Sequence, residues 1–223
     1  MRPAIVFDLD GTLVDSAPDI RAVASAVLEA EGAPGLDLAE VRAFMGNGAP
    51  VFVQRMIAAR GLSGDVATHA RLLDGFLVRY DSALGLTRLY PGAAEALATL
   101  SAAGHVLGLC TNKPERPTRA VLAHLGLAET FAAIVCGDTL PTRKPDPAPL
   151  RHCLAEMNAP GGFFVGDSEV DAETAARAGL PFVLHTGGYR RAPVSAIVHA
   201  AAFDDHAALA PILALLAAPG SAG

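Results

Sequence analysis

The chain has 223 residues, of which 52% are hydrophobic and 18% charged, and its formal net charge is −6. This length supports a full hydrophobic core without metal or disulfide support, and the acidic balance argues against the non-specific nucleic-acid binding that basic surfaces provide. No apolar run approaches the about 20 residues of a membrane span, and the first one ends at Asp8 and Asp10, unlike a signal peptide. Three cysteines without close spacing indicate reduced thiols, so we expect a cytoplasmic protein with no membrane or nucleic-acid partner.

Short apolar runs alternate with helical patterns along most of the chain. Uninterrupted runs are typical of parallel strands that are covered on both faces. Strands are predicted at 5–7, 106–110, 133–136, 163–165, 182–184 and, as a sixth, 197–203. Helices are predicted between them at 93–103, 116–125, 148–157 and 171–178. The alternation predicts an α/β fold whose core is a doubly wound, Rossmann-like parallel sheet.

One interval between the first strand and Tyr90 contains no convincing strand. Instead, helical periodicity runs through 17–31, 38–60 and 65–85, with breaks at 32–35 and 61–64. The interval is too long for the loop of a strand–helix crossover. It predicts an all-helical insertion at 16–89, with hinges near 15–18 and 87–91, in a core formed by 1–15 and 90–223.

Carboxylates follow two of the predicted strands. Asp8 and Asp10 come directly after the first strand, and Asp167 and Asp171 follow the strand at 163–165. Ligands of open α/β sheets bind beyond the carboxyl ends of the strands, so these side chains are expected to converge. Converging carboxylates repel one another unless a cation is present, and an all-oxygen ligand set suits Mg²⁺.

A magnesium ion beside glycine-rich turns suits a phosphate ester as substrate. Asp8 is placed to attack phosphorus and form an aspartyl-phosphate, and Asp10 to protonate the leaving alkoxide and later deprotonate water. Phosphoryl oxygens would be held by the Thr111 hydroxyl and by neighbouring backbone groups, including those of Gly11 and Asn112, with Lys144 as the offsetting cation. Taken one at a time, these residues could equally be helix caps or solvated loop residues. Their occurrence together, each at a strand end or in a loop, is far more specific for a phosphate-ester site.

The combined pattern resembles the haloacid dehalogenase superfamily of phosphohydrolases over nearly the whole chain. The matching motifs are DxDGT at 8–12, the strand-end Thr111, the loop Lys144 and GDxxxD at 166–171. The resemblance implies that Asp8 is the nucleophile and a Mg²⁺ ligand. It also implies that Asp10 binds the metal through its carbonyl, that Asp167 is a ligand, and that Asp171 supports the metal or Lys144. The inserted helices would form a mobile cap that closes over the substrate.

Within this superfamily, several segments are similar to those of bacterial phosphoglycolate phosphatases. These segments lie at 13–19, 41–50, 111–114, 137–141 and 143–145. The resemblance implies a small phosphorylated metabolite, 2-phosphoglycolate, as substrate. The carboxylate at the end of this substrate opposite the phosphate needs hydrogen-bond donors or a cation from the cap. The candidates are Arg42, Asn47 and Gly48. An ordinary turn between two helices, with arginines on the surface, explains the same residues equally well.

Other functions remain open at this stage. They include a phosphatase for pyrophosphate or sugar phosphates, a phosphomutase similar to β-phosphoglucomutase, and a non-catalytic binding protein. No lysine lies between Asp15 and Tyr90, which excludes the Schiff-base chemistry of related phosphonatases and weakens the phosphomutase. The intact Asp8, Lys144 and Asp167 argue against a binding protein.

Overall fold

A six-stranded parallel sheet forms the core of the computed structural model, which describes residues 2–218. The central strand β1 (Ala4–Phe7) lies between β4 (Leu107–Cys110) and β6 (Gly162–Gly166). The remaining strands are β5 (Ala133–Val135), β7 (Phe182–His185) and β8 (Ala201–Phe203), and the sheet order is β5-β4-β1-β6-β7-β8. The predicted doubly wound sheet is confirmed. The sixth strand, β8, is shorter than its predicted range.

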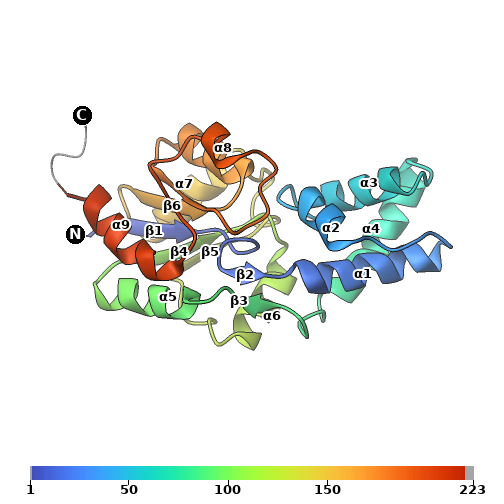
Figure 1. Cartoon of the computed structure of the whole chain (residues 1–223), viewed down its shortest axis with the longest axis horizontal. Coiled ribbons are helices and arrows are strands. Elements are labelled where there is room, and N and C mark those ends of the chain that lie inside the picture. The colour runs from blue at the N-terminus through green and yellow to red at the C-terminus, as the bar shows by residue number, and fades with distance from the viewer. Residues whose placement is uncertain (1, 219–223) are drawn as a thin grey trace.

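Both faces of the sheet are covered, which explains the unbroken apolar runs. Ile5 and Phe7 point to one face, where they share a hydrophobic cluster with α5 (Ala93–Ala102), α6 (Glu115–His124) and α9 (Leu209–Leu216). Ala4 and Val6 point to the other face, beneath α7 (Ala148–Glu156) and α8 (Glu169–Ala178). Figure 1 shows these helices on opposite sides of the strands.

Four helices between β2 (Val14–Asp15) and β3 (Arg88–Leu89), which we refer to as the insertion, share a hydrophobic cluster of their own. The insertion contains α1 (Ala17–Ala30), α2 (Leu38–Phe44), α3 (Ala49–Ala59) and α4 (Val66–Tyr80), which lie together at one end of the molecule in Figure 1. The single helix predicted at 38–60 is wrong. The chain becomes extended at Met45, and Gly46 and Gly48 adopt positive φ, so a turn separates α2 from α3. The helix predicted at 65–85 ends at Tyr80.

A short ribbon joins the insertion to the core. The two linkers pair as antiparallel strands β2 (Val14–Asp15) and β3 (Arg88–Leu89), which the sequence did not predict. The buried carboxylate of Asp19 reinforces the junction because its Oδ2 accepts hydrogen bonds from the Leu86 and Thr87 backbone amides and from the Thr87 hydroxyl. The hinge ranges proposed near 15–18 and 87–91 overlap this ribbon.

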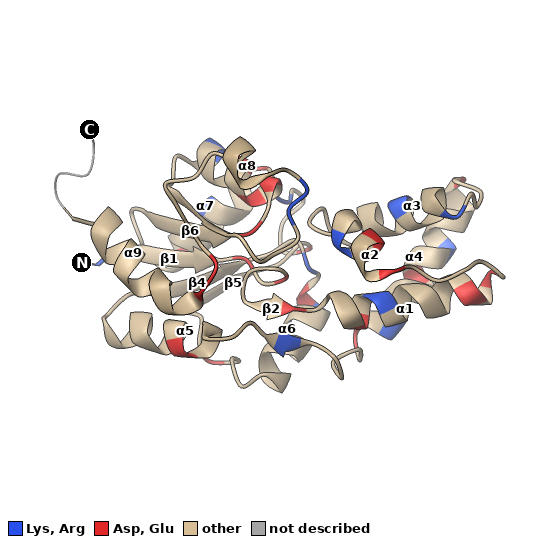
Figure 2. Cartoon of the chain, in the orientation of Figure 1, with Lys and Arg blue, Asp and Glu red and all other residues tan. Residues whose placement is uncertain are grey.

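Charged residues of both signs are interspersed along the helices of the insertion in the view of Figure 2. None of the helices within residues 2–218 combines the length and the hydropathy needed to cross a membrane.

Candidate active site

A cavity lies between the carboxyl edge of the sheet and the helical insertion. Its core wall includes Asp8 after β1, Thr111 after β4 and Asp167 after β6. The insertion contributes Phe52 of α3 and Phe76 of α4. The topology therefore brings residues that are far apart in the sequence to one place.

Three buried carboxylates lie close together at this cavity, and two of them, Asp8 and Asp167, line it. Asp8, Asp167 and Asp171 each offer an oxygen, and these oxygens lie within 4.8 Å of one another. Burial, together with the charge of Asp171, raises the pKa of Asp8 to about 7, although Lys144 acts in the opposite direction. Burial and the charges of Asp171 and Asp8 also raise the pKa of Asp167 well above its ordinary value. Without a further cation the cluster therefore favours the protonated form of these carboxyls.

Lys144 is the cation within this cluster. Its Nζ lies 3.0 Å from Asp8 Oδ1 and 2.7 Å from Asp171 Oδ1. Burial opposes its charge, but the carboxylates of Asp171 and Asp8 outweigh burial and raise the pKa of the ammonium. Asp171 is satisfied on its other oxygen as well, because Ser168 at the start of α8 donates its hydroxyl and its backbone N–H to Oδ2. Asp171 thus forms an ion pair with Lys144 and accepts hydrogen bonds from the N-terminal end of α8.

Asp167 is held by two donors and enclosed by two glycines. Its Oδ1 accepts a hydrogen bond from the Thr12 hydroxyl at 2.9 Å, and its Oδ2 accepts one from the Tyr189 backbone N–H at 2.6 Å. A Cβ at Gly11 would lie 2.4 Å from Asp167 Oδ2, and one at Gly188 would lie 2.3 Å from the Asp167 Cβ. Only glycine fits either position, so the close approach explains both residues.

The donor set fits a divalent cation. Asp8 Oδ1 is buried and pairs with Lys144 by charge, yet no donor within residues 2–218 reaches it with hydrogen-bond geometry. A single ammonium faces three carboxylates, and hard oxygen ligands are those that Mg²⁺ prefers. A magnesium ion would be held by Asp8 and Asp167.

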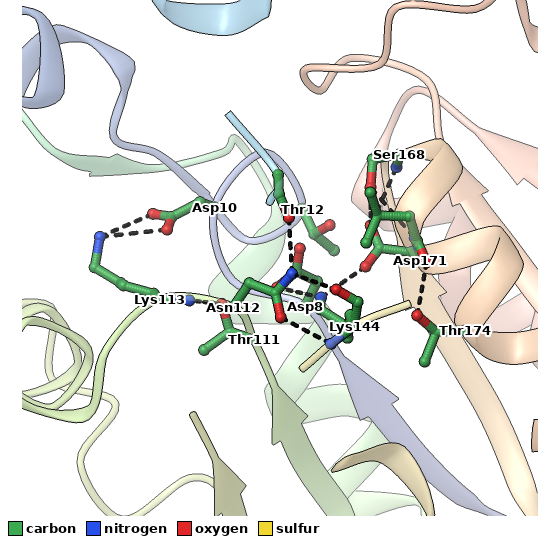
Figure 3. Close-up of polar contacts among 12 residues, drawn as sticks. Asp8, Asp10, Thr12, Thr111, Asn112, Lys113, Lys144, Ser168, Asp171 and Thr174 are labelled. Carbon is green, nitrogen blue, oxygen red and sulfur yellow. Dashed lines mark hydrogen bonds and ion pairs between the residues drawn. The ribbon is translucent and has the colours of Figure 1, made fainter. Parts of the chain in front are cut away.

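The side chain of Asp10 is turned away from this cluster, toward Lys113 (Figure 3). Its Oδ1 accepts hydrogen bonds from the Ser16 hydroxyl at 2.6 Å and from Lys113 Nζ at 3.1 Å. Lys113 is buried, donates to the Tyr80 hydroxyl, and lies 4.3 Å from the centroid of the Tyr80 ring. Because Tyr80 belongs to α4, Lys113 links the acid/base candidate to that helix.

The candidate phosphate-binding residues differ in what their groups contact. Thr111 is buried at the cavity wall, and its hydroxyl accepts the Lys113 backbone N–H at 3.2 Å. The Asn112 amide donates to the carbonyls of Gly46 and Lys144 and accepts the Lys144 N–H, so it fastens two loops together. The Gly11 N–H donates to Val14 O at 2.8 Å, which closes the turn after β1. The hydroxyl of Thr111 thus lies at the cavity, whereas the Asn112 side chain and the Gly11 N–H are engaged elsewhere.

Of the three candidate residues in the insertion, only Gly48 lines the cavity. Asn47 Oδ1 accepts a hydrogen bond from Arg55, and Arg42 forms an ion pair with Asp15 at 3.4 Å. A cation that the sequence analysis did not select, Arg191, lines the cavity from the core side.

Two buried histidines and Tyr189 also support the site. His185 Nδ1 donates to Gly11 O at 2.8 Å, and His206 Nε2 donates to Thr12 O at 2.9 Å. Burial lowers the pKa of both rings, that of His185 to about 4. Through these hydrogen bonds the neutral rings hold the backbone of the DxDGT turn at residues 8–12 in place. No motif marks these residues in the sequence, because their partners lie more than 170 positions away.

Residues 3–179 match the family described as haloacid dehalogenase-like hydrolase. Because this match covers most of the chain, the chain belongs to the haloacid dehalogenase-like hydrolases. Enzymes of this family generally use a divalent metal, typically Mg²⁺, in keeping with the carboxylate cluster.

Curated and structural relatives narrow the class further. A phosphoglycolate phosphatase of Cereibacter sphaeroides (strain ATCC 17029 / ATH 2.4.9) is 50% identical over 97% of this chain and 100% of its own length. A crystal structure described as a predicted phosphoglycolate phosphatase from Haemophilus somnus is 32% identical, with a TM-score of 0.89 over 95% of this chain and 97% of its own. CbbY from Rhodobacter sphaeroides, in complex with xylulose-(1,5)bisphosphate, is 26% identical, with a TM-score of 0.77 over 96% of this chain and 99% of its own. The chain is an enzyme of the phosphoric monoester hydrolase class, most similar to bacterial phosphoglycolate phosphatases.

Proposed function

We propose that this enzyme hydrolyses 2-phosphoglycolate to glycolate and phosphate. The observation that carries the proposal is the convergence of Asp8 and Asp167 on one cavity, with Lys144 Nζ 3.0 Å from Asp8 Oδ1. The choice of substrate is supported by relatives named phosphoglycolate phosphatase that are 42% to 50% identical over nearly the whole chain.

Asp8 is the proposed nucleophile. One of its carboxylate oxygens attacks phosphorus, the bond between phosphorus and the glycolate oxygen breaks, and its electron pair stays on that oxygen. Asp10, which lines the same cavity, gives its proton to the leaving oxygen. Glycolate then leaves, and an aspartyl-phosphate remains on Asp8.

Water completes the cycle with the same two residues. Asp10 takes a proton from the water as the water oxygen attacks phosphorus. The bond between phosphorus and Asp8 breaks, which restores the carboxylate and releases phosphate. Ser16 and Lys113 hold the Asp10 carboxyl between these transfers.

Charge on the phosphoryl group is offset within the cavity. Lys144 lies beside the nucleophile, and the Thr111 hydroxyl lies at the adjoining wall. Asp8 and Asp167, with the Asp10 carbonyl, would hold Mg²⁺, which supplies positive charge to the phosphoryl oxygens. The role of Asp171 is to orient Lys144, whose Nζ donates a hydrogen bond to Asp171 Oδ1 at 2.7 Å.

The helical insertion is the proposed cap, spanning 16–89, and it would exclude water from the phosphorylated intermediate. The apolar rings of Phe52 and Phe76 line its side of the cavity. Gly48 remains a candidate for contact with the substrate carboxylate. Arg42 and Asn47 are engaged with Asp15 and Arg55 and are weaker candidates.

A phosphate-release panel tests the proposal. The panel contains 2-phosphoglycolate, pyrophosphate, sugar phosphates and nucleotides, each with Mg²⁺ and with a chelator. We expect kcat/KM for 2-phosphoglycolate to be at least about tenfold above that for every other compound, and activity to require Mg²⁺. Faster turnover of another compound would overturn the assignment of substrate.

A sugar bisphosphate phosphatase is the second candidate. It is favoured by the structural likeness to CbbY, whose structure contains xylulose-(1,5)bisphosphate. This function ranks second because CbbY is 26% identical to this chain, whereas the phosphoglycolate phosphatase of Cereibacter sphaeroides is 50% identical. In the same panel, conversion of glucose 1-phosphate without phosphate release would reveal a phosphomutase, and no turnover of any compound would favour a binding protein.

We also propose that the enzyme works in the cytoplasm. Cys110, Cys136 and Cys153 are free and buried, which is consistent with a reducing compartment.

A further inference from the structure

Tyr189 belongs to the core by sequence but to the insertion by packing. It follows β7, and only 7% of its surface is exposed. Among residues 2–218, it is the one member of the insertion's buried hydrophobic cluster that lies outside residues 17–80. Its ring is therefore enclosed by a part of the molecule that its own backbone does not belong to.

The Tyr189 hydroxyl binds the linker through which the chain enters the insertion. It accepts hydrogen bonds from the backbone N–H groups of Ser16 at 2.9 Å and Ala17 at 3.2 Å. It donates to Asp15 Oδ1 at 2.6 Å. Three consecutive residues of the linker thus share one phenol oxygen.

These contacts replace a missing helix cap. Ser16 occupies the N-cap position of α1, where a serine hydroxyl normally accepts a backbone N–H of the first turn. Here it makes no such bond, because its hydroxyl donates to Asp10 Oδ1 instead. Amides at a helix start need an acceptor. Tyr189 supplies one from the core to both Ser16 and Ala17, and Asp15 Oδ1 is a second acceptor for the Ala17 amide at 3.2 Å.

The backbone of the same residue binds the metal-site carboxylate. The Tyr189 N–H donates to Asp167 Oδ2 at 2.6 Å, and the absence of a side chain at Gly188 allows this approach. One rigid residue therefore contacts both Asp167 and the start of α1. Movement of α1 relative to the core must either break the three phenol contacts or move the Tyr189 backbone.

We infer that Tyr189 is a positioning residue that couples the entry linker of the insertion to the Asp167 carboxylate. The inference rests on the proposed function in one respect, namely that Asp167 binds Mg²⁺. Coupling of this kind is reciprocal. Mg²⁺ at Asp167 stabilises the 188–189 backbone and, through the phenol, the amides of Ser16 and Ala17.

Amide hydrogen exchange measured by NMR tests the coupling. Mg²⁺ alone, with no substrate, is added to the full-length protein, and exchange is followed at the Ser16 and Ala17 amides. We expect Mg²⁺ to slow both amides about tenfold, with a concentration dependence that follows Mg²⁺ binding measured by calorimetry.

The decisive variant is Tyr189→Phe, which keeps the ring and the backbone N–H but removes the hydroxyl. We expect the effect of Mg²⁺ on the two amides to disappear and kcat/KM to fall about tenfold. The control is Ser101→Ala. It removes an exposed hydroxyl from α5, outside the residues that line the cavity; we expect this variant to behave as the wild type.

Two results would overturn the coupling. One is unchanged exchange at Ser16 and Ala17 when Mg²⁺ binds the wild type, which needs no variant. The other is equal protection by Mg²⁺ in the wild type and in a folded Tyr189→Phe. If 2-phosphoglycolate is still hydrolysed with Mg²⁺, only the coupling has failed; if Mg²⁺ neither binds nor supports hydrolysis, the proposed function fails with it.

Discussion

The buried carboxylate of Asp8 lies beside two others and has one lysine as its counter-charge. Asp8→Asn removes the nucleophile, and we expect turnover to fall at least about 1000-fold. The same change removes a repelling charge from Asp167 and Asp171. We therefore expect the melting temperature in a chelator to rise, even though activity is lost.

The control for this prediction is Asp74→Asn. Asp74 is exposed on α4, so it loses the same charge far from the cavity. We expect neither its turnover nor its melting temperature to change. Substantial activity in Asp8→Asn would contradict the proposed mechanism.

Substitution of Lys144 should have the opposite effect on stability, because it leaves the buried carboxylates of Asp8 and Asp171 without a counter-charge. Breaking a buried ion pair on one side costs about 3–5 kcal/mol. We expect Lys144→Met to lower the free energy of unfolding by that amount in urea titrations. The double variant Lys144→Met with Asp171→Asn should regain part of the loss without regaining activity. A Lys144→Met protein as stable as the wild type would show that the pair is not a structural requirement.

At the level of elements, the turn after β1 depends on Gly11. Gly11 has φ +87° and its Cβ would collide with Asp167, whereas Gly126 has φ +73° and open space around it. Both substitutions to alanine incur the cost of a positive φ, about 1 kcal/mol. We expect Gly11→Ala, but not Gly126→Ala, to weaken Mg²⁺ binding in calorimetry by at least about tenfold. Equal Mg²⁺ affinity in the two variants would refute this role of Gly11.

The sheet could be predicted because its strands are unbroken apolar runs, as at Ile5, Val6 and Phe7. The boundary between α2 and α3 was not predicted, because the apolar pattern does not stop there. Apolar residues such as Phe44 and Phe52 continue a helical spacing across the turn, and only the glycines at 46 and 48 signal the break. The ribbon of β2 and β3 has two residues in each strand, too few to show a pattern.

Some residues of the candidate site could be predicted from the sequence and others could not. Asp8, Lys144 and Asp167 could be selected because they follow strand ends or lie in loops, and their motifs are local. Tyr189 and His185 could not, because their importance comes from contacts with residues more than 170 positions away. Asn112 stands between the two cases: its position was predictable, but the partners of its amide were not.

For the molecule as a whole, the carboxylate cluster links metal binding to pH. The pKa of Asp8 is raised to about 7, so without metal the native state holds a proton that the unfolded state has lost above about pH 4. This contribution to stability is present at low pH and is lost as the pH rises through about 7. Mg²⁺ needs the deprotonated ligands, so the rise in melting temperature that it causes should grow from about pH 5 to about pH 8.

Thermal melts with Mg²⁺ and with a chelator across this range check the prediction. Asp8→Asn serves as the reference, since it lacks the titrating carboxyl, and its response to Mg²⁺ should be smaller and flatter with pH. A wild-type response to Mg²⁺ that is independent of pH would contradict the linkage.

The pairing of Val14 with Leu89 and of Asp15 with Arg88 makes the entire helical insertion the loop of a β-hairpin. The length of such a loop has only a small entropic cost. An insertion of different size or sequence can therefore replace residues 17–86 while the strands at its base, and the carboxylates beyond them, stay in register. In evolution and in protein engineering alike, the proposed cap can be exchanged while the strands that carry the carboxylates are inherited intact.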